Sequence, residues 1–338
     1  MATNRVILWG ALLMLVGLAD LAHAAEKPRT AVSVVFAGDV MLDNGPGHAV
    51  VHGEDPFAEF APIFAQADIS VCNLECVVAE GGEQEDKPYT FLAPPKCIPL
   101  LKQHFSAVTV ANNHSGDFGK KAFCEQLDLF DKAGLPYFGG GRNVRQARAP
   151  LLLERHGRRV ALLGYNSFPP RRFEAGPKTP GTAWLIEDQC LAEIKAARTK
   201  HRADIVIPYL HWGKEERPSP QAWQRNLARQ MIDAGADAVI GTHAHAVQTV
   251  DLYRGKPIVY SLGNFVFDYY PVDPLVFTGW VVRLTFDEKA GVNMQTYVLE
   301  IDRTGIPHLV EGAKEILAED LPATAAPPSA LPRKAPRP

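Results

Sequence analysis

The chain has 338 residues, a formal net charge of −3 and 46% hydrophobic residues. This length is enough for one large or two small domains. The near-neutral charge and ordinary apolar content exclude a coiled coil, a disordered chain and a basic nucleic-acid-binding protein, so we expect no nucleic acid among the partners.

Residues 1–24 have the pattern of a secretory signal peptide. A basic start precedes an apolar run from Val6 to Ala19, and Ala22-His23-Ala24 forms a small-residue cleavage site. The run is short for a membrane span of about 20 residues, although an uncleaved anchor is an alternative. We therefore expect an exported protein, periplasmic or extracellular, that contacts a membrane only through this segment, if at all.

In the first half of the remaining chain, three apolar runs have the composition of buried strands. Each is followed within a few residues by polar residues. The runs and these residues are Ala31 to Phe36 before Asp39, Asp68 to Cys72 before Asn73 and Glu75, and Ala107 to Ala111 before Asn113, His114 and Asp117. Helical spacing of apolar residues predicts a helix from Lys120 to Ala133, ended by Gly134.

The second half repeats this arrangement. Three further runs end in polar residues: Asp204 to Leu210 before His211 and Glu215, Asp237 to Ile240 before His243 and His245, and Pro257 to Ser261 before Asn264. Residues 188–199 and 221–234 are predicted helices. Two alternating segments, 281–286 and 292–301, predict antiparallel strands. We expect one domain over residues 30–316 and a disordered Pro/Ala-rich tail over 317–338.

The stretch from Gly241 to His245 follows a predicted buried strand and contains two histidines that are separated by one residue. On an extended chain, residues i and i+2 share one side, so both imidazoles could face one ion. Histidine is also the commonest metal ligand. The short pattern is equally compatible with two ordinary loop histidines, so the rest of the chain must decide between these interpretations.

The polar residues at the strand ends together favour a metal centre. If strands alternate with helices, these ends meet at one rim of a sheet. Carboxylates, an amide oxygen and several imidazoles suit a borderline divalent ion such as zinc, manganese or iron. Two carboxylates could flank a pair of ions about 3.5–4 Å apart.

Six short motifs in this order resemble the bacterial capsule synthesis family of poly-γ-glutamate synthesis, the CapA/PgsA-like proteins. They span roughly residues 32 to 268, most of the mature chain, and are Gly38 to Leu42, Asn73 to Glu75, Ala111 to Gly119, His211 to Glu215, Gly241 to His245 and Ser261 to Phe265. This family is similar in fold to the calcineurin-like metallophosphatases. The resemblance therefore implies an α/β fold, a four-layer αββα sandwich with mixed β-sheets.

The resemblance also implies roles for single residues. The implied metal ligands are Asp39, Glu75, Asn113, His211, His243 and His245. His114 matches the histidine that assists the leaving group and is the candidate catalytic residue. The other polar motif residues, Asn73, Asp117, Glu215 and Asn264, are candidates for substrate binding. The pattern departs from the metallophosphatases at Met41, which replaces an imidazole ligand, so we expect one or two ions.

Two functions of different kinds follow. The first is an exported metal-dependent hydrolase in which an ion activates water and His114 protonates the leaving group. Its substrate would be a γ-glutamyl polymer, or a phosphoester if the fold analogy holds. The second is a non-catalytic accessory that binds or exports an anionic polymer. A membrane-bound polymer synthase is a candidate partner in both cases.

Overall fold

The computed structural model describes residues 30–268, 274–288 and 291–310. The predicted signal peptide and the predicted tail lie outside the described residues, as does the predicted domain end at residue 316. Within the described ranges, no helix is both long enough and apolar enough to cross a membrane.

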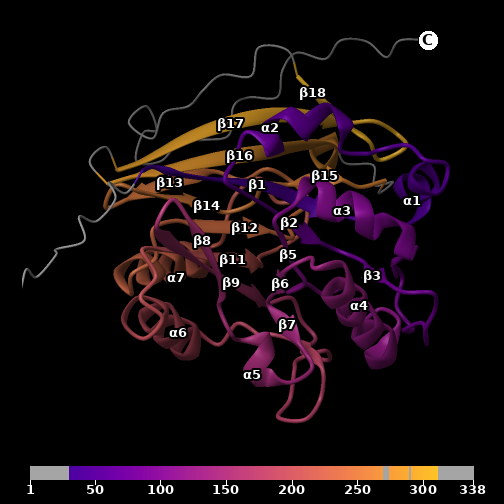
Figure 1. Ribbon diagram of the computed structural model, residues 1–338, viewed down its shortest axis with the longest axis horizontal. Coiled ribbons are helices and arrows are strands. Elements are labelled where there is room, and N and C mark those ends of the chain that lie inside the picture. Colours follow the sequence, from indigo (N-terminus) through magenta and orange to yellow (C-terminus); the bar gives the residue numbers. More distant parts are fainter. Residues whose placement is uncertain (1–29, 269–273, 289–290, 311–338) are drawn as a thin grey trace, which may run out of the picture.

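Two mixed β-sheets form the centre of the molecule (Figure 1). The larger sheet contains, in spatial order, β18 (Pro307–Leu309), β17 (Gly291–Ile301), β16 (Thr278–Asp287), β1 (Val32–Val40), β2 (Ile69–Leu74), β5 (Ala107–Thr109) and β6 (Tyr137–Phe138), with β15 (Asn264–Val266) also paired to β1. The second contains β13 (Val250–Tyr253), β14 (Lys256–Val259), β12 (Val239–Thr242), β11 (Ile205–His211), β9 (Arg158–Asn166) and β8 (Leu151–Arg155). Two short pairs are β3 (Val77–Val78) with β4 (Leu92–Ala93), and β7 (Gly140–Gly141) with β10 (Gly181–Thr182).

The two sheets pack face to face through a shared apolar core. Val34 and Phe36 of β1 contribute from one sheet, and Ile207 and Tyr209 of β11 from the other. The Phe36 and Tyr209 rings lie 5.9 Å apart. Every second side chain of these strands points to this face, and many of them are β-branched or aromatic. Each strand therefore buries apolar area against the partner sheet, which stabilises the fold by about 25 cal/mol per Å².

Helices cover the outer face of each sheet. The larger sheet is covered by α1 (Asn44–Val51), α2 (Ala61–Ala65), α3 (Ile98–His104) and α4 (Gly119–Ala133), and the second by α5 (Val144–Ala147), α6 (Glu187–Thr199) and α7 (Ala222–Asp233). Three short 3₁₀ turns are η1 (Ala58–Phe60), η2 (Pro95–Cys97) and η3 (Pro274–Phe277). In Figure 1, α3 and α4 lie on the opposite side of the molecule from α6 and α7. The predicted four-layer αββα sandwich with mixed sheets is therefore confirmed.

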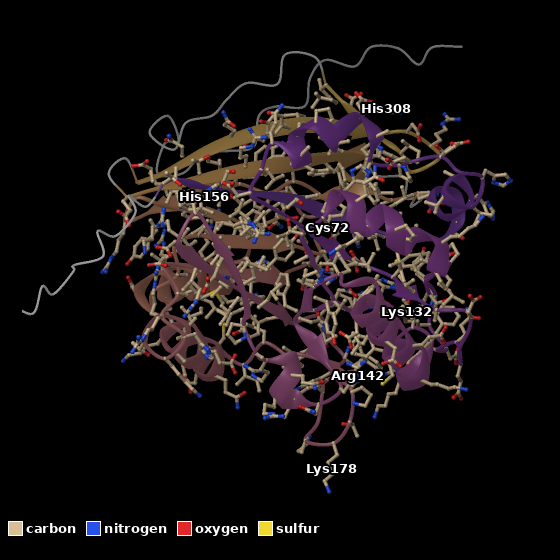
Figure 2. The ribbon with its side chains drawn as sticks, in the orientation of Figure 1. Cys72, Lys132, Arg142, His156, Lys178 and His308 are labelled. Carbon is tan, nitrogen blue, oxygen red and sulfur yellow. The ribbon has the colours of Figure 1, made fainter. Side chains whose placement is uncertain are left out.

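The predicted elements agree closely with these boundaries. The predicted helix that Gly134 ends is α4, and Gly134 has the left-handed φ of 63° that favours glycine there. The predicted antiparallel pair is β16 and β17. All five cysteines are free, and Figure 2 shows Cys72 in the interior, whereas Lys178 lies at the tip of an exposed loop.

One expectation about topology was wrong. The strand ends were predicted to meet at the rim of a single sheet, but β1, β2 and β5 belong to one sheet and β11 and β12 to the other. Residue patterns show where strands end but do not show which sheet a strand joins. The polar residues still converge, because Glu75 at the end of β2 lies beside His211 and His243 at the ends of β11 and β12.

Candidate metal centre

Residues from the larger sheet form one side of the centre. Asp39 lies in β1 and is paired in register with Asn73 of β2 and with Asn264 of β15. Glu75 directly follows β2. Gly38 allows this arrangement, because a Cβ there would lie 2.0 Å from the carbonyl oxygen of Gly263. The close approach of β15 to β1 brings Asp39 and Asn264 into the same buried layer.

Residues from the second sheet form the other side. His211 is the last residue of β11, and His243 and His245 follow β12. The two histidines were predicted to lie on an extended chain, which is wrong: their φ angles are 86° and 52°. Left-handed backbone at a residue other than glycine is strained and concentrates at functional sites. The turn nevertheless keeps both rings together, with centroids 6.0 Å apart.

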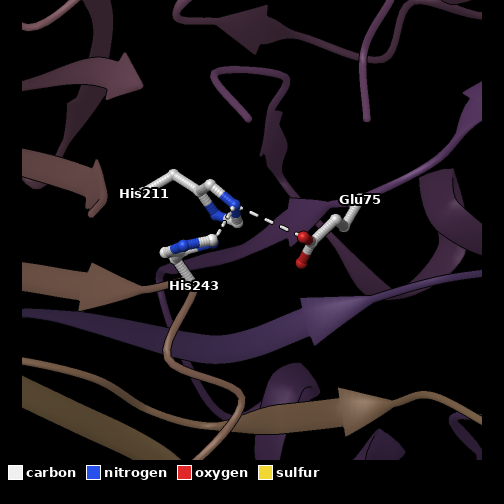
Figure 3. A group of neighbouring side chains, drawn as sticks. All are labelled: Glu75, His211 and His243. Carbon is white, nitrogen blue, oxygen red and sulfur yellow. Dashed lines mark hydrogen bonds and ion pairs between the residues drawn. The ribbon is translucent and has the colours of Figure 1, made fainter. Parts of the chain in front are cut away.

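The predicted ligands form overlapping groups that could hold an ion. In each group, one ligand atom per residue lies within 4.8 Å of the others. The groups are Glu75 with His211 and His243 (Figure 3), Asp39 with Glu75 and His245, and Glu215 with His243 and His245. Glu75 belongs to the first two groups, so its carboxylate is shared between them.

The first group is completed by an amide. The Asn113 Oδ1 lies 2.6 Å from the His211 Nε2. The same nitrogen lies 3.0 Å from the His243 Nδ1 and 3.3 Å from the Glu75 Oε1. Four potential ligand atoms therefore surround one small volume. Asn113 is the only one of these four residues that is not fully buried.

Two asparagines hold the carboxylates in place. The Asn73 Nδ2 donates to the Asp39 Oδ1 at 2.8 Å and to the Glu75 Oε2 at 3.4 Å. The Asn112 Nδ2 in turn donates to the Asn73 Oδ1 at 3.0 Å and to the Leu74 carbonyl at 2.7 Å. Asn73 was predicted to bind substrate, but it is completely buried and contacts the two acids. Asn112 was missed as a functional residue although it belongs to a recognised motif.

A third amide orients His245. The Asn264 Oδ1 accepts from the His245 Nδ1 at 2.8 Å, and the Asn264 Nδ2 donates to the Val276 carbonyl at 3.1 Å. The bond fixes the tautomer of His245 and turns its Nε2 toward the Glu75 Oε1, 3.9 Å away. Asn264, predicted to contact substrate, is thus buried behind a candidate metal ligand. The ring of Phe168, a residue without a sequence signal, packs 4.3 Å from that of His243.

Two observations show that these residues fit a divalent cation. The Glu75 Oε1 and the His243 Nε2 are buried atoms without a hydrogen-bond partner among the described residues. Burial raises the pKa of Asp39 and, aided by the charge of Asp39, raises that of Glu75 well above its ordinary range. Burial also lowers the pKa of His211 and His243. A cation bound by the Glu75 group would satisfy the Glu75 Oε1 and offset the cost of burying two carboxylates beside neutral imidazoles.

His114 lies beside the centre and is not in any of the three groups. Its Nδ1 lies 2.7 Å from the Asp117 Oδ2, so Asp117 orients the ring. The opposite nitrogen, Nε2, points inward and lies 4.0 Å from the Glu75 Oε1. Lys87, which had no sequence signal, is ion-paired to the Asp117 Oδ1 at 2.5 Å. Asp117 was predicted to bind substrate, but its carboxylate is buried and engaged by His114 and Lys87.

Two adjoining cavities give access to the centre. One, of about 370 Å³, is lined by residues that include Lys87, Tyr89, His114, Phe168, Trp184 and Glu215. The other, of about 660 Å³, is lined by residues that include Phe168, Lys214, Glu215, Arg217 and Gln221. Glu215 and Phe168 border both cavities. Glu215 is the one predicted site residue with an exposed side chain.

An αββα sandwich with buried carboxylates and imidazoles at the carboxyl ends of its parallel strands defines a candidate metalloprotein. Residues 33–269 match the family described as bacterial capsule synthesis protein PGA_cap. The match covers more than half of the chain and contains every residue of the centre. The protein belongs to this family of capsule synthesis proteins, as the sequence motifs predicted.

Individual relatives agree with this assignment. The PGA biosynthesis protein CapA of Bacillus subtilis is 32% identical over 259 residues, which cover 73% of this chain and 68% of that protein. A probable polyglutamine synthesis accessory protein of Mycobacterium tuberculosis is 32% identical over 230 residues, covering 63% of this chain and 60% of that protein. The chain thus spans about two thirds of the length of these relatives.

The fold also occurs in solved structures. A hypothetical protein from Thermus thermophilus matches 80% of this chain and 99% of its own, with a TM-score of 0.50 and 17% sequence identity. At this identity the likeness concerns the fold alone.

Proposed function

We propose that this protein is an exported, metal-dependent hydrolase that cleaves γ-glutamyl bonds during the synthesis or processing of a capsule polymer. One observation carries the proposal. Two buried carboxylates and three imidazoles lie together next to the histidine–aspartate pair of His114 and Asp117, and buried atoms of Glu75 and His243 have no hydrogen-bond partner among the described residues. A site that only stabilised the fold would pair its buried polar atoms with each other.

The residues of the chain would divide the work as follows. Asp39, Glu75, Asn113, His211, His243 and His245 would hold one or two ions. When bound, a divalent ion supplies Lewis-acid activation of water and of the scissile carbonyl. Asn73 and Asn264 keep the ligands in position.

His114 would move the proton. Burial lowers the pKa of His114 despite its bond to Asp117, so the ring is neutral near pH 7 and its Nε2 accepts a proton. In hydrolysis of an amide, hydroxide adds to the carbonyl carbon and a proton goes to the departing nitrogen. His114 would take this proton from the attacking water and deliver it to the nitrogen, while Asp117 stabilises the intervening imidazolium.

The second candidate is a non-catalytic accessory that binds the polymer through the same centre. Two observations favour it. The Mycobacterium tuberculosis relative is named as an accessory protein, and Met41 occupies the position at which a metallophosphatase has an imidazole ligand. A phosphoesterase is a further alternative that uses the same ions. In each case we propose an anionic polymer or its synthase as the partner, and we propose export on the basis of residues 1–24.

Turnover assays distinguish these functions. Purified protein loaded with zinc, manganese or iron is incubated with a γ-glutamyl oligomer and, separately, with a generic phosphodiester. The hydrolase predicts metal-dependent release of glutamate-containing fragments and little phosphodiester cleavage. Tight metal binding without cleavage of either substrate would favour the accessory. Phosphodiester cleavage alone would favour the phosphoesterase.

A further inference from the structure

The two halves of the centre differ in their number of ligands. Four residues surround one half, namely Glu75, Asn113, His211 and His243. Among the described residues, the carboxylates and imidazoles of the other half are Asp39, Glu75 and His245. Met41 cannot complete it, because its side chain is fully buried and its Sδ accepts a hydrogen bond from the Asp43 backbone at 3.1 Å. A thioether is also a poor ligand for a hard ion.

A carboxylate on another loop lies close to His245 of this incomplete half and to His243 of the other half. Glu215 is in the loop between β11 and α7, and one of its oxygens lies within 4.8 Å of ring nitrogens of both His243 and His245. The loop is fixed against the histidine segment, since the Glu216 backbone N–H donates to the Ala244 carbonyl at 2.9 Å.

We propose that Glu215 is a ligand of the ion held by Asp39, Glu75 and His245, in place of the imidazole that is absent at Met41. This inference rests on the proposed metal centre and assigns Glu215 a different role from the substrate contact predicted from sequence. The two ions would then differ in how readily they exchange with ions in solution. The first half is enclosed by side chains that are largely buried, whereas Glu215 closes the second half from the exposed, cavity-lining side.

Metal titration of three proteins tests this assignment. Metal-free wild type, Glu215→Gln and Glu216→Gln are titrated with zinc by calorimetry, and bound ions are counted by native mass spectrometry. Glu216 is the matched control, because it is adjacent and exposed and belongs to none of the ligand groups. We expect Glu215→Gln to weaken the affinity for one ion by more than about 10-fold. Even residues that only contact a metal ligand change metal affinity by about 10- to 100-fold.

The same samples provide a readout that does not depend on activity. Metal-free Glu215→Gln should melt at the wild-type temperature, because the substituted side chain is exposed. Its increase in melting temperature on adding zinc should be smaller than that of wild type or Glu216→Gln. A general folding defect would instead lower the melting temperature of the metal-free protein.

Each outcome has one meaning. Equal ion counts and affinities in Glu215→Gln and Glu216→Gln would overturn the assignment and leave the metal centre intact. The assignment would also be overturned if Glu215→Gln bound zinc normally and lost only affinity for a γ-glutamyl oligomer. A wild-type protein that binds no ion would overturn the proposed centre itself.

Discussion

The substitution Glu75→Gln tests whether Glu75 is a metal ligand or an ordinary buried acid. Glu75 is fully buried and its Oε1 has no hydrogen-bond partner among the described residues. Burial and the charge of Asp39 raise its pKa well above the ordinary value of 4.5. In the metal-free protein, Glu75→Gln should therefore increase stability at neutral pH, because the variant has no charge to bury.

The magnitude follows from the cost of the unsatisfied group. Leaving a buried polar atom unpaired costs about 1–3 kcal/mol, and about 1 kcal/mol shifts the melting temperature of a domain of this size by roughly 2–4 °C. Because the folded-state pKa is raised, the carboxyl of Glu75 contributes stability that is fully present below 4.5 and is lost as pH rises through the folded-state pKa. The advantage of Glu75→Gln should therefore grow with pH above 4.5.

Scanning calorimetry of the chelator-treated and zinc-loaded proteins measures both effects. With free zinc at 100 times the dissociation constant, wild type should gain about 2.7 kcal/mol, and Glu75→Gln should gain much less. Asp251→Asn is the control, because Asp251 is buried but paired with Arg225 at 2.8 Å. That variant should lose about 3–5 kcal/mol with or without zinc. If metal-free Glu75→Gln lost stability as Asp251→Asn does, the interpretation of Glu75 as an unpaired ligand would be refuted.

Three further predictions concern other parts of the chain. His114→Ala should leave the zinc content unchanged and reduce turnover by about 10²–10⁴-fold, whereas His243→Ala should reduce zinc affinity; kinetics and metal analysis of both variants check this. Gly38→Ala should destabilise the protein by at least about 1–3 kcal/mol, measured by denaturant unfolding, because its Cβ would lie 2.0 Å from the Gly263 carbonyl oxygen. Mass spectrometry of the exported protein should find an N-terminus near Ala25, and a chain that retains residues 6–19 would show an uncleaved anchor.

The sequence was most informative about the ends of strands. Apolar runs that stop at a polar residue predicted Asp39, His211 and the histidine pair at the correct ends of β1, β11 and β12. Such runs are visible because a strand buried on both faces is continuously apolar, so the first polar residue marks its end. The same signal placed Asn113 and His114 directly after the β5 run.

Contacts that depend on the tertiary fold could not be predicted. Lys87 reaches Asp117 from a loop of no distinctive composition, and Phe168 reaches His243 from a loop rich in proline and charge. The backbone of His243 is left-handed, which no residue pattern indicates because such strain is imposed by surrounding structure. The different positions of the motif residues within the site could also not be predicted from the sequence. Asn73 and Asn264 contact the ligands from behind, whereas Glu215 faces the cavities.

Anomalous diffraction from crystals of the zinc-loaded mature protein tests the metal centre most directly. The proposed centre predicts an anomalous peak between Glu75, His211 and His243, with zinc about 2.0–2.2 Å from their nitrogen and oxygen atoms. A second, weaker peak is expected beside Asp39 and His245. Zinc-loaded crystals without an anomalous peak at Glu75 would contradict the account.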